Sequence, residues 1–465
     1  MKKTNTKYIL VISMVSAMGG LLFGYDWVVI GGAKPFYEKF FDIAAYPNLQ
    51  GWAMSCALIG CLLGAITSGI FSDRFGRKKL LIFSAFLFTL SAIGTGATYT
   101  FNMFIFYRIM GGVGIGLTSN LSPMYIAEIS PAGARGKFVS LNQLTIVIGI
   151  LLAQITNWQI AMPVAPNATD AEILTSWNGQ TGWRLMFWAE TIPAGLFFVL
   201  MFFVPESPRW LVKNGDKDQA LAVLERIGGK TYALNEYRTI SQTVLSDTEK
   251  FKLAALIRPG LKKVLLIGIV LAAFQQWCGI NVIFNYAEEV FAAAGYGVSD
   301  ILFNIVVTGS VNLIFTFVAI FSVDRLGRRF LMMLGAAGLA GVYALMGTAY
   351  FLHISGWPLL LLVVLAIACY ATSLAPVTWV VLSEIFPNRI RGAAMAAATV
   401  SLWLASFLLT YTFPILNQVF GASGTFWLYG IICIAGFLFI YYLLPETKGR
   451  SLEEIERTLV KQPSP

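Results

Sequence analysis

The sequence predicts an all-α membrane protein with twelve transmembrane helices in two six-helix halves. Of its 465 residues, 57% are hydrophobic and only 12% are charged, whereas a soluble domain carries about 25% charged residues. Apolar runs of about 20 residues, the length needed to span a bilayer, recur along the chain. Three short charged motifs also occur twice in the same order, which indicates an internal duplication.

The twelve apolar runs contain frequent Gly and Pro. This is typical of membrane helices, where neighbouring helices satisfy the freed backbone groups. The predicted spans are residues 8–33, 51–72, 79–98, 102–128, 138–160, 185–204, 263–291, 301–322, 330–350, 357–383, 391–413 and 424–444.

Positive charge is unevenly distributed between alternate loops. If the N-terminus is cytoplasmic, nearly all of the 33 Lys and Arg residues lie on the cytoplasmic side. The exceptions are Lys34, Lys39 and Arg184, expected in outer loops, and Arg108, within a span. This asymmetry places both termini in the cytoplasm. The net charge of +9 therefore indicates topology and contact with the lipid bilayer, and we expect no nucleic-acid partner.

The duplicated motifs divide the chain into halves of like orientation. The pairs are DRFGRK (73–78) with DRLGRR (324–329), EISPAGARG (128–136) with EIFPNRIRG (384–392), and PESPR (205–209) with PETKG (445–449). Transporters built from such repeats bind substrate near mid-membrane between the repeats. The expected parts are an N-terminal half (1–204), a cytoplasmic helical linker (205–260), a C-terminal half (261–445) and a cytoplasmic tail (446–465).

Acidic and basic residues recur together in these motifs, at the predicted cytoplasmic ends of the helices. Gly76 and Gly327 permit tight turns there. Acid–base pairing across helix ends could latch the cytoplasmic side closed; the alternative is that the charges only set topology and cap helices. The candidate gating charges are Asp73, Arg74, Arg77, Glu128, Arg135, Glu206, Arg209, Asp324, Arg325, Arg328, Glu384, Arg391 and Glu446.

Together the motifs resemble those of the sugar porter family of the major facilitator superfamily. The series runs GGLLFGYD, DRFGRKK, YIAEISPAGARGK, PESPRWL, FQQWCGINVIFNYA, VDRLGRR, WVVLSEIFPNRIRG and PETKGRSLEE, and it covers about residues 10–456. Within the family the chain is most similar to bacterial proton-coupled symporters of the D-xylose type. The resemblance implies symport of a monosaccharide, a pentose such as D-xylose or a hexose such as D-glucose; a facilitative uniporter is the alternative.

A sugar presents a ring of hydroxyls, which amides and flat aromatic rings can bind. Gln276 and Asn281 in the seventh span fall roughly on one helix face. The alternative role for such amides is to join helices, at about 0.6 kcal/mol per bond. The resemblance implies sugar contacts at Phe23, Gln143, Gln275, Gln276, Asn281, Asn285, Asn312, Trp379 and Trp403.

Three positions depart from the family pattern at or beside the expected pocket. Asn285-Tyr286 replaces the usual tyrosine pair, Leu402 replaces the amide before the eleventh-span tryptophan, and Ala375 replaces the glycine before the tenth-span proline. These changes leave the identity of the sugar open.

Three charges lie well inside predicted spans of the first half, away from the span ends: Asp26, Arg108 and Glu190. A carboxylate in mid-membrane costs about 2.5–3.5 kcal/mol on insertion scales and usually marks an ion or substrate pathway. The resemblance implies that Asp26 takes up the coupled proton, with Arg108 as its partner and Glu190 nearby. The alternative is a static Asp26–Arg108 ion pair, since breaking a buried pair is strongly destabilising.

Other function classes lack support in the sequence. The nearest candidate for an ATP-binding loop, Gly229-Lys230-Thr231, has Leu224 where the first glycine is needed. His353 is the single histidine, and the five cysteines show no metal-ligand spacing. We therefore expect a transporter and not an enzyme, with no cofactor or metal. The expected state is a monomer in the bacterial inner membrane.

Overall fold

The computed structural model describes residues 4–165, 168–246, 259–386 and 391–448; the regular secondary structure in these ranges is helical, with no strand in them. Eleven helical segments of this part are long and apolar enough to cross a membrane. The last, Ala393–Leu443, joins two helices across a kink at Gly421, whose φ is 67°. Each of the twelve predicted spans therefore has a helical counterpart, and the predicted all-α membrane fold is confirmed.

The chain divides into two compact units. Unit 1 takes in the described residues of Met1–Trp27, Ile59–Ala153 and Phe187–Phe251, and unit 2 those of Val28–Leu58, Gln154–Met186 and Lys252–Pro465. The division runs through three long helices, which contribute one end to each unit: α1 (Thr6–Phe40), α2 (Pro47–Phe75) and α5 (Arg135–Ile160).

Unit 1 is held together by close helix packing. Its remaining helices are α3 (Arg77–Ala97), α4 (Phe101–Ile129), α8 (Thr191–Phe203), α9 (Pro208–Lys213), α10 (Lys217–Gly228) and α11 (Lys230–Ser246), with the short turn η1 (Ala132–Ala134). α3 packs against α4 and α8. A Cβ on Gly24 would collide with the carbonyl oxygen of Ile146, and one on Gly149 with that of Leu21. Glycine thus allows α1 and α5 to touch backbone to backbone, as is common between membrane helices.

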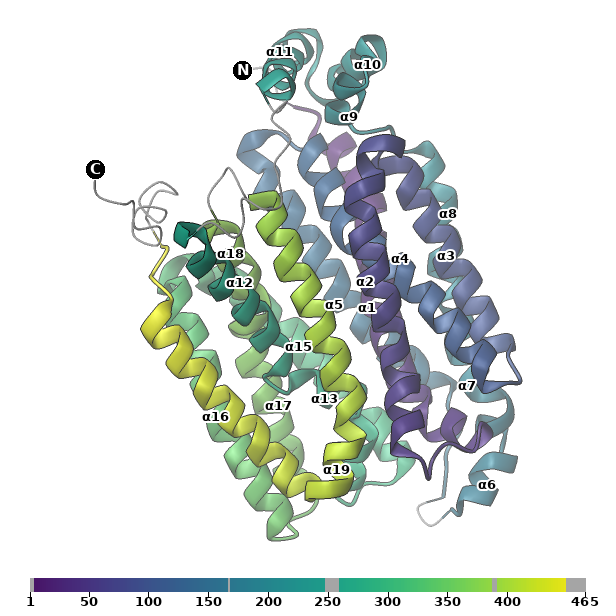
Figure 1. Ribbon diagram of the computed structural model, residues 1–465. Coiled ribbons are helices and arrows are strands. Elements are labelled where there is room, and N and C mark those ends of the chain that lie inside the picture. The colour runs from purple at the N-terminus through teal and green to yellow at the C-terminus, as the bar shows by residue number, and fades with distance from the viewer. Residues whose placement is uncertain (1–3, 166–167, 247–258, 387–390, 449–465) are drawn as a thin grey trace. The chain divides into compact units, whose positions relative to one another are not determined.

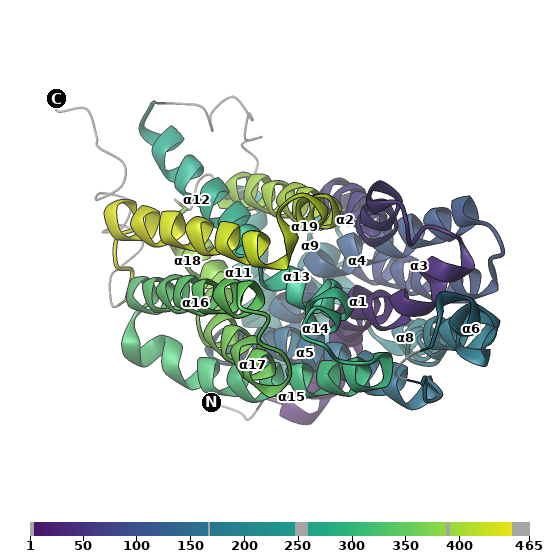
Figure 2. The same ribbon diagram turned by 90° about the horizontal axis from the view of Figure 1, so that it is seen from below.

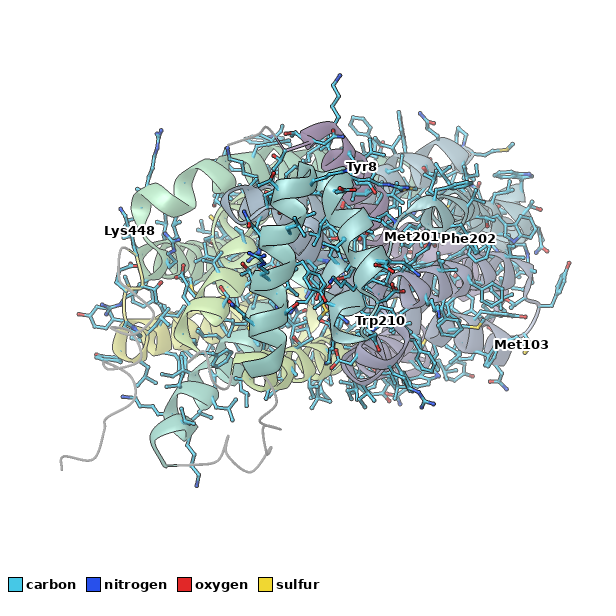
Figure 3. All side chains as sticks on the ribbon, turned by 90° about the horizontal axis from the view of Figure 1, so that it is seen from above. Tyr8, Met103, Met201, Phe202, Trp210 and Lys448 are labelled. Carbon is cyan, nitrogen blue, oxygen red and sulfur yellow. The ribbon has the colours of Figure 1, made fainter. Side chains whose placement is uncertain are left out.

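The described residues that directly follow α8 form three further helices. α9, α10 and α11 group together beyond the ends of the long helices of unit 1 (Figure 1). α10 buries one apolar side, including Val223 and Leu224, and Asn5 donates its backbone N–H to Ile227 at 2.8 Å. Trp210 on α9, which Figure 3 labels, donates its indole N–H to the carbonyl of Asp73 at 3.0 Å. These helices are therefore fastened to unit 1.

Unit 2 contains several interrupted helices. It comprises α6 (Asp170–Thr175), η2 (Asn178–Gly182), the first part of α7 (Trp183–Ala189), α12 (Pro259–Trp277), α13 (Ile280–Asn285), α14 (Ala287–Ala292), α15 (Val298–Leu326), α16 (Arg328–Phe351), α17 (Trp357–Thr372), α18 (Leu374–Ile385) and α19 (Arg391–Leu443). α12 and α16 both pack on α19. Helix breaks expose backbone and polar side chains, and in transporters they often mark the substrate site.

Two basic residues predicted in outer loops are instead buried in helices, which corrects the sequence prediction. α1 does not end near residue 33 but continues to Phe40, and Lys34 within it is only 2% exposed. Arg184 lies in α7, is 6% exposed, and packs its guanidinium over the rings of Phe40 and Trp183. The predicted spans stop one residue short of Lys34 and Arg184, whereas paired charges and aromatic contacts let these helices include both residues.

Candidate functional site

Asp26 and Arg108 form a buried ion pair in unit 1. Asp26 lies on α1 and Arg108 on α4, and each residue is 2% exposed. The guanidinium Nη1 donates to Asp26 Oδ1, and Nη2 reaches the backbone carbonyl of Asp26 at 3.5 Å. The guanidinium also lies 5.7 Å from the ring centre of Phe187. The sequence predicted these two residues as partners, and the structure brings them together.

Glu190 is a second acidic residue that interacts with this pair, and it lies at a break between two helices. It is the residue between α7 and α8 and is 2% exposed. Pro193, three residues on, has no N–H to continue the hydrogen-bond ladder, which accounts for the break. The charge of Glu190 interacts with those of Asp26 and Arg108. We call Asp26, Arg108 and Glu190 the acid–base cluster.

The acid–base cluster contains one more acid than base. If both carboxyl groups were ionised, it would carry a net negative charge away from water, which is unfavourable. Oδ2 of Asp26 and Oε1 of Glu190 are buried and accept no hydrogen bond from any residue that the structure describes. A proton on one carboxyl group would balance the charge and supply a donor. The geometry therefore suits a group that gains and loses a proton.

A chain of amides lies in unit 2, where α12 gives way to α13. Nδ2 of Asn281 donates to Oε1 of Gln276, Nε2 of Gln276 donates to Oε1 of Gln275 at 2.6 Å, and Nε2 of Gln275 donates to the hydroxyl of Tyr370 at 2.8 Å. The three amide residues are 5–7% exposed. The break comes at Gly279, whose φ of 87° favours glycine. The break places all three amides together, so they can present a row of donors and acceptors to a ligand.

The other predicted sugar residues are distributed between the units. In unit 2, Asn285 ends α13 with its Oδ1 buried and accepting no hydrogen bond from the described residues. Asn312 on α15 and Trp403 on α19 are buried, and Trp379 on α18 is half-buried. In unit 1, Phe23 on α1 packs edge-on against Trp27, and Gln143 on α5 is half-buried.

The duplicated motifs form the same contacts in each unit. In unit 1, Arg77 pairs with Glu128 at 3.0 Å; in unit 2, the corresponding Arg328 pairs with Glu384 at 3.3 Å. Gly76 and Gly327 have φ of 88° and 94°, so the predicted tight turns are present.

A second acid in each unit binds the backbone just after the turn. Glu206 accepts the N–H groups of Arg77 and Lys78, at 3.0 and 3.2 Å. Glu446 accepts those of Arg328 and Arg329, at 3.0 and 3.1 Å. These carboxylates sit at the N-termini of α3 and α16, where the helix dipole favours negative charge. Each unit thus ties three helix ends together with one arginine and two acids.

The remaining candidate gating charges lie around these clusters. Asp73 pairs with Lys213 at 2.8 Å, and Arg74 packs over Phe75. Arg135 donates to the carbonyl of Ala127 at 3.1 Å, so its described partner is backbone and not an acid. Arg209 and Arg325 are exposed. The side chains of Asp324 and Arg391 lie outside the part that the structure describes.

The sequence analysis does not predict one polar cluster, which lies at the C-terminal end of α1. Lys34 contacts three glutamates there: Glu38 on the same helix, and Glu288 and Glu289 on α14. The spacing of Lys34 and Glu38 by four residues, which places them on one helix face, was the available signal.

Comparisons with known proteins agree with this architecture. The family described as "Sugar (and other) transporter" matches residues 12–459. The chain is 40% identical to the D-xylose-proton symporter of Escherichia coli (strain K12), over 97% of this chain and 96% of that protein. It is 38% identical to the arabinose-proton symporter of Bacillus subtilis (strain 168), over 98% and 96%. The inward open structure of the xylose transporter XylE from E. coli matches with a TM-score of 0.84 and 38% identity, covering 97% of this chain and 100% of that one.

Proposed function

Because this chain belongs to the sugar transporter family of the major facilitator superfamily, we propose that it moves a monosaccharide into the cell together with a proton. The acid–base cluster is the observation that carries this proposal. Asp26, Arg108 and Glu190 are each 2% exposed, and together they hold one acid in excess of base. A uniporter needs no such group, since it moves sugar without an ion.

The sugar would bind to the amide chain. Each NH₂ group of Gln275, Gln276 and Asn281 carries two hydrogens, and the described contacts use one of them. The second hydrogens and the amide oxygens suit the hydroxyls of a pentose or hexose. Asn285, Asn312, Trp379 and Trp403 would complete the part of the site in unit 2, and Phe23 and Gln143 are the candidate sugar contacts of unit 1. D-Xylose and L-arabinose are the first candidates, because relatives named for xylose and arabinose are 40% and 38% identical to this chain, and D-glucose is the third.

The charge distribution supports an orientation with both termini in the cytoplasm of a bacterial cell and the protein in the inner membrane. The paired motifs around Arg77 and Arg328 then lie at the cytoplasmic ends of the helices. There they would hold each half as a rigid body during alternating access. Basic residues at these ends would contact anionic lipid. A monomer suffices for this mechanism, because both halves belong to one chain.

A direct test is uptake of radiolabelled sugar into proteoliposomes with an imposed pH gradient, acid outside. We expect accumulation above the external concentration for one of D-xylose, L-arabinose and D-glucose, with the others as competitors. A protonophore should abolish the accumulation while equilibration continues. If sugar only equilibrates whatever the gradient, the protein is a facilitative uniporter. If none of the three sugars enters, the substrate class is wrong.

A further inference from the structure

The outer end of α1 carries a buried ion cluster that neither the proton site nor the sugar site uses. Nζ of Lys34 lies 3.0 Å from Glu38, 3.4 Å from Glu288 and 2.6 Å from Glu289. The Lys34 side chain is 3% exposed, and its Nζ lies 5.9 Å from the ring centre of Tyr286. Figure 2 shows α14 beside the end of α1. One ammonium group therefore joins two segments that are far apart in the sequence.

The three glutamates have different structural consequences. Glu38 lies four residues after Lys34 on α1, so that pair forms whatever α14 does. Glu288 and Glu289 both belong to α14, and their contacts with Lys34 exist only while α14 lies against α1. A buried lysine needs charged partners, and Glu38 can supply one when α14 is absent. The cluster thus tolerates both an associated and a separated arrangement of the two helices.

The neighbouring backbone is packed tightly at the same place. Gly31 lies three residues before Lys34, and a Cβ there would lie 3.1 Å from the carbonyl oxygen of Phe284 and 3.2 Å from that of Asn285. α13 and α14 form a short segment with a non-helical joint at each end of α13. These joints are Gly279, with φ of 87°, and Tyr286, with φ of −118° and ψ of 34°. Such joints allow a short segment to move without unfolding the helices beside it.

We propose that Lys34, Glu288 and Glu289 form an ionic latch that holds the outer ends of α1 and α14 together and that breaks when the outer path to the sugar opens. This inference rests on the proposed transport function. The amide chain lies on the segment that leads into α13, so separation of α14 from α1 would uncover the approach to the sugar site. Lys34 acts here as a positioning residue and does not contact the sugar.

The variant that tests the latch is Glu288→Gln with Glu289→Gln. It removes both charges from α14 and leaves Lys34 paired with Glu38, so no unpaired lysine remains buried. Two matched controls are available. Glu38→Gln removes an acid from the same cluster without cutting the tie to α14. Asp170→Asn breaks the Lys39–Asp170 pair, which is formed at 3.2 Å in unit 2 by an Asp170 side chain that is 80% exposed.

The readout is the separation between α14 and the turn after α1, measured by double electron–electron resonance in proteoliposomes. Spin labels at Ala44→Cys and Ala292→Cys, both exposed positions, report it in a background without the native cysteines. We expect the double variant to shift the distance distribution to longer values, while both controls keep the wild-type distribution. The apparent KM for external sugar should fall by roughly threefold, because a larger fraction of molecules is competent to bind.

An unchanged distance distribution in the double variant would overturn the latch. If the double variant fails to fold, Glu289→Gln alone removes the 2.6 Å contact and must still lengthen the separation. The distance measurement needs neither sugar nor a proton gradient. Failure of the latch is therefore distinguishable from failure of the proposed function, which the uptake assay tests separately.

Discussion

The guanidinium of Arg108 is ion-paired with the carboxylate of Asp26, and both side chains are 3% exposed. Glu190 adds a second acid, so the acid–base cluster is balanced only when one carboxyl group holds a proton. In a static ion pair the third group would have no role. The extra acid, Glu190, therefore favours proton-coupled transport over the alternative in which Asp26 and Arg108 form only a static ion pair.

Replacing Arg108 alone should lower the free energy of unfolding far more than replacing Asp26 and Arg108 together. Arg108→Gln leaves two buried carboxyl groups without a base, and we expect it to lower the free energy of unfolding by about 3–5 kcal/mol. The double variant Asp26→Asn, Arg108→Gln should recover most of that loss. Thermal unfolding in detergent measures the cycle. Additive losses would show that the two side chains do not interact.

The amide chain should control sugar affinity. Gln276 accepts from Asn281 and donates to Gln275, so Gln276→Ala interrupts the chain at its centre. Loss of about 1–1.5 kcal/mol of hydrogen bonding corresponds to roughly a tenfold rise in Kd. Equilibrium binding of radiolabelled sugar provides the measurement. Tyr370→Phe, which removes only the partner of Gln275, should have a smaller effect. Equal affinity for Gln276→Ala and wild type would assign the amides to helix packing.

The two turn glycines should not accept a side chain. Gly76 and Gly327 have positive φ, and a Cβ at either would collide with a carboxylate oxygen, of Glu206 and Glu446 respectively. We expect Gly76→Ala and Gly327→Ala each to destabilise the protein by about 1–2 kcal/mol.

Gly69→Ala is the matched control for these two substitutions. It places a Cβ inside α2 with nothing within 4 Å, and it should be neutral or stabilising. Melting temperatures distinguish these outcomes. A similar loss at all three positions would contradict the structural reason given for the turns.

The cap of α6 should be sensitive to acid. The N–H and hydroxyl of Thr169 donate to Glu172, and these bonds hold the pKa of Glu172 below its usual 4.5. For a lowered pKa, the stabilisation is present above the unfolded value and is lost as pH falls through the folded value. Hydrogen exchange in α6 should therefore become faster below about pH 4.5, relative to the intrinsic rate. Glu172→Gln should remove this pH dependence, and persistence of it would show another origin.

The sequence predicts a charged residue's role well where the sequence also indicates which residue it pairs with. Asp26, Arg108 and Glu190 were found because each charge stood alone in an apolar run. The pairing of Arg77 with Glu128 was harder, because the motif offered several bases and only the turn at Gly76 decides which one faces Glu128. Arg135, an equally plausible partner by sequence, instead binds the carbonyl of Ala127.

The latch residues were missed for a different reason. A hydropathy pattern ends the first span before Lys34, because a lysine is costly in a membrane helix. Its partners Glu288 and Glu289 lie more than 250 positions away, and a hydropathy pattern carries no information about such pairing. Glycine at position 279 favours the positive φ of the first break, but neither that break nor the one at Tyr286 indicates from sequence that α14 lies against α1.

In the proposed mechanism, Asp26 takes up a proton when sugar crosses the membrane. The measurement is the change in external pH when sugar is added to lightly buffered proteoliposomes. We expect alkalinisation of the outside for wild type, and none for Asp26→Asn, which should still exchange labelled sugar across the membrane. Sugar entry by wild type without proton movement, or unchanged proton uptake by Asp26→Asn, would contradict it.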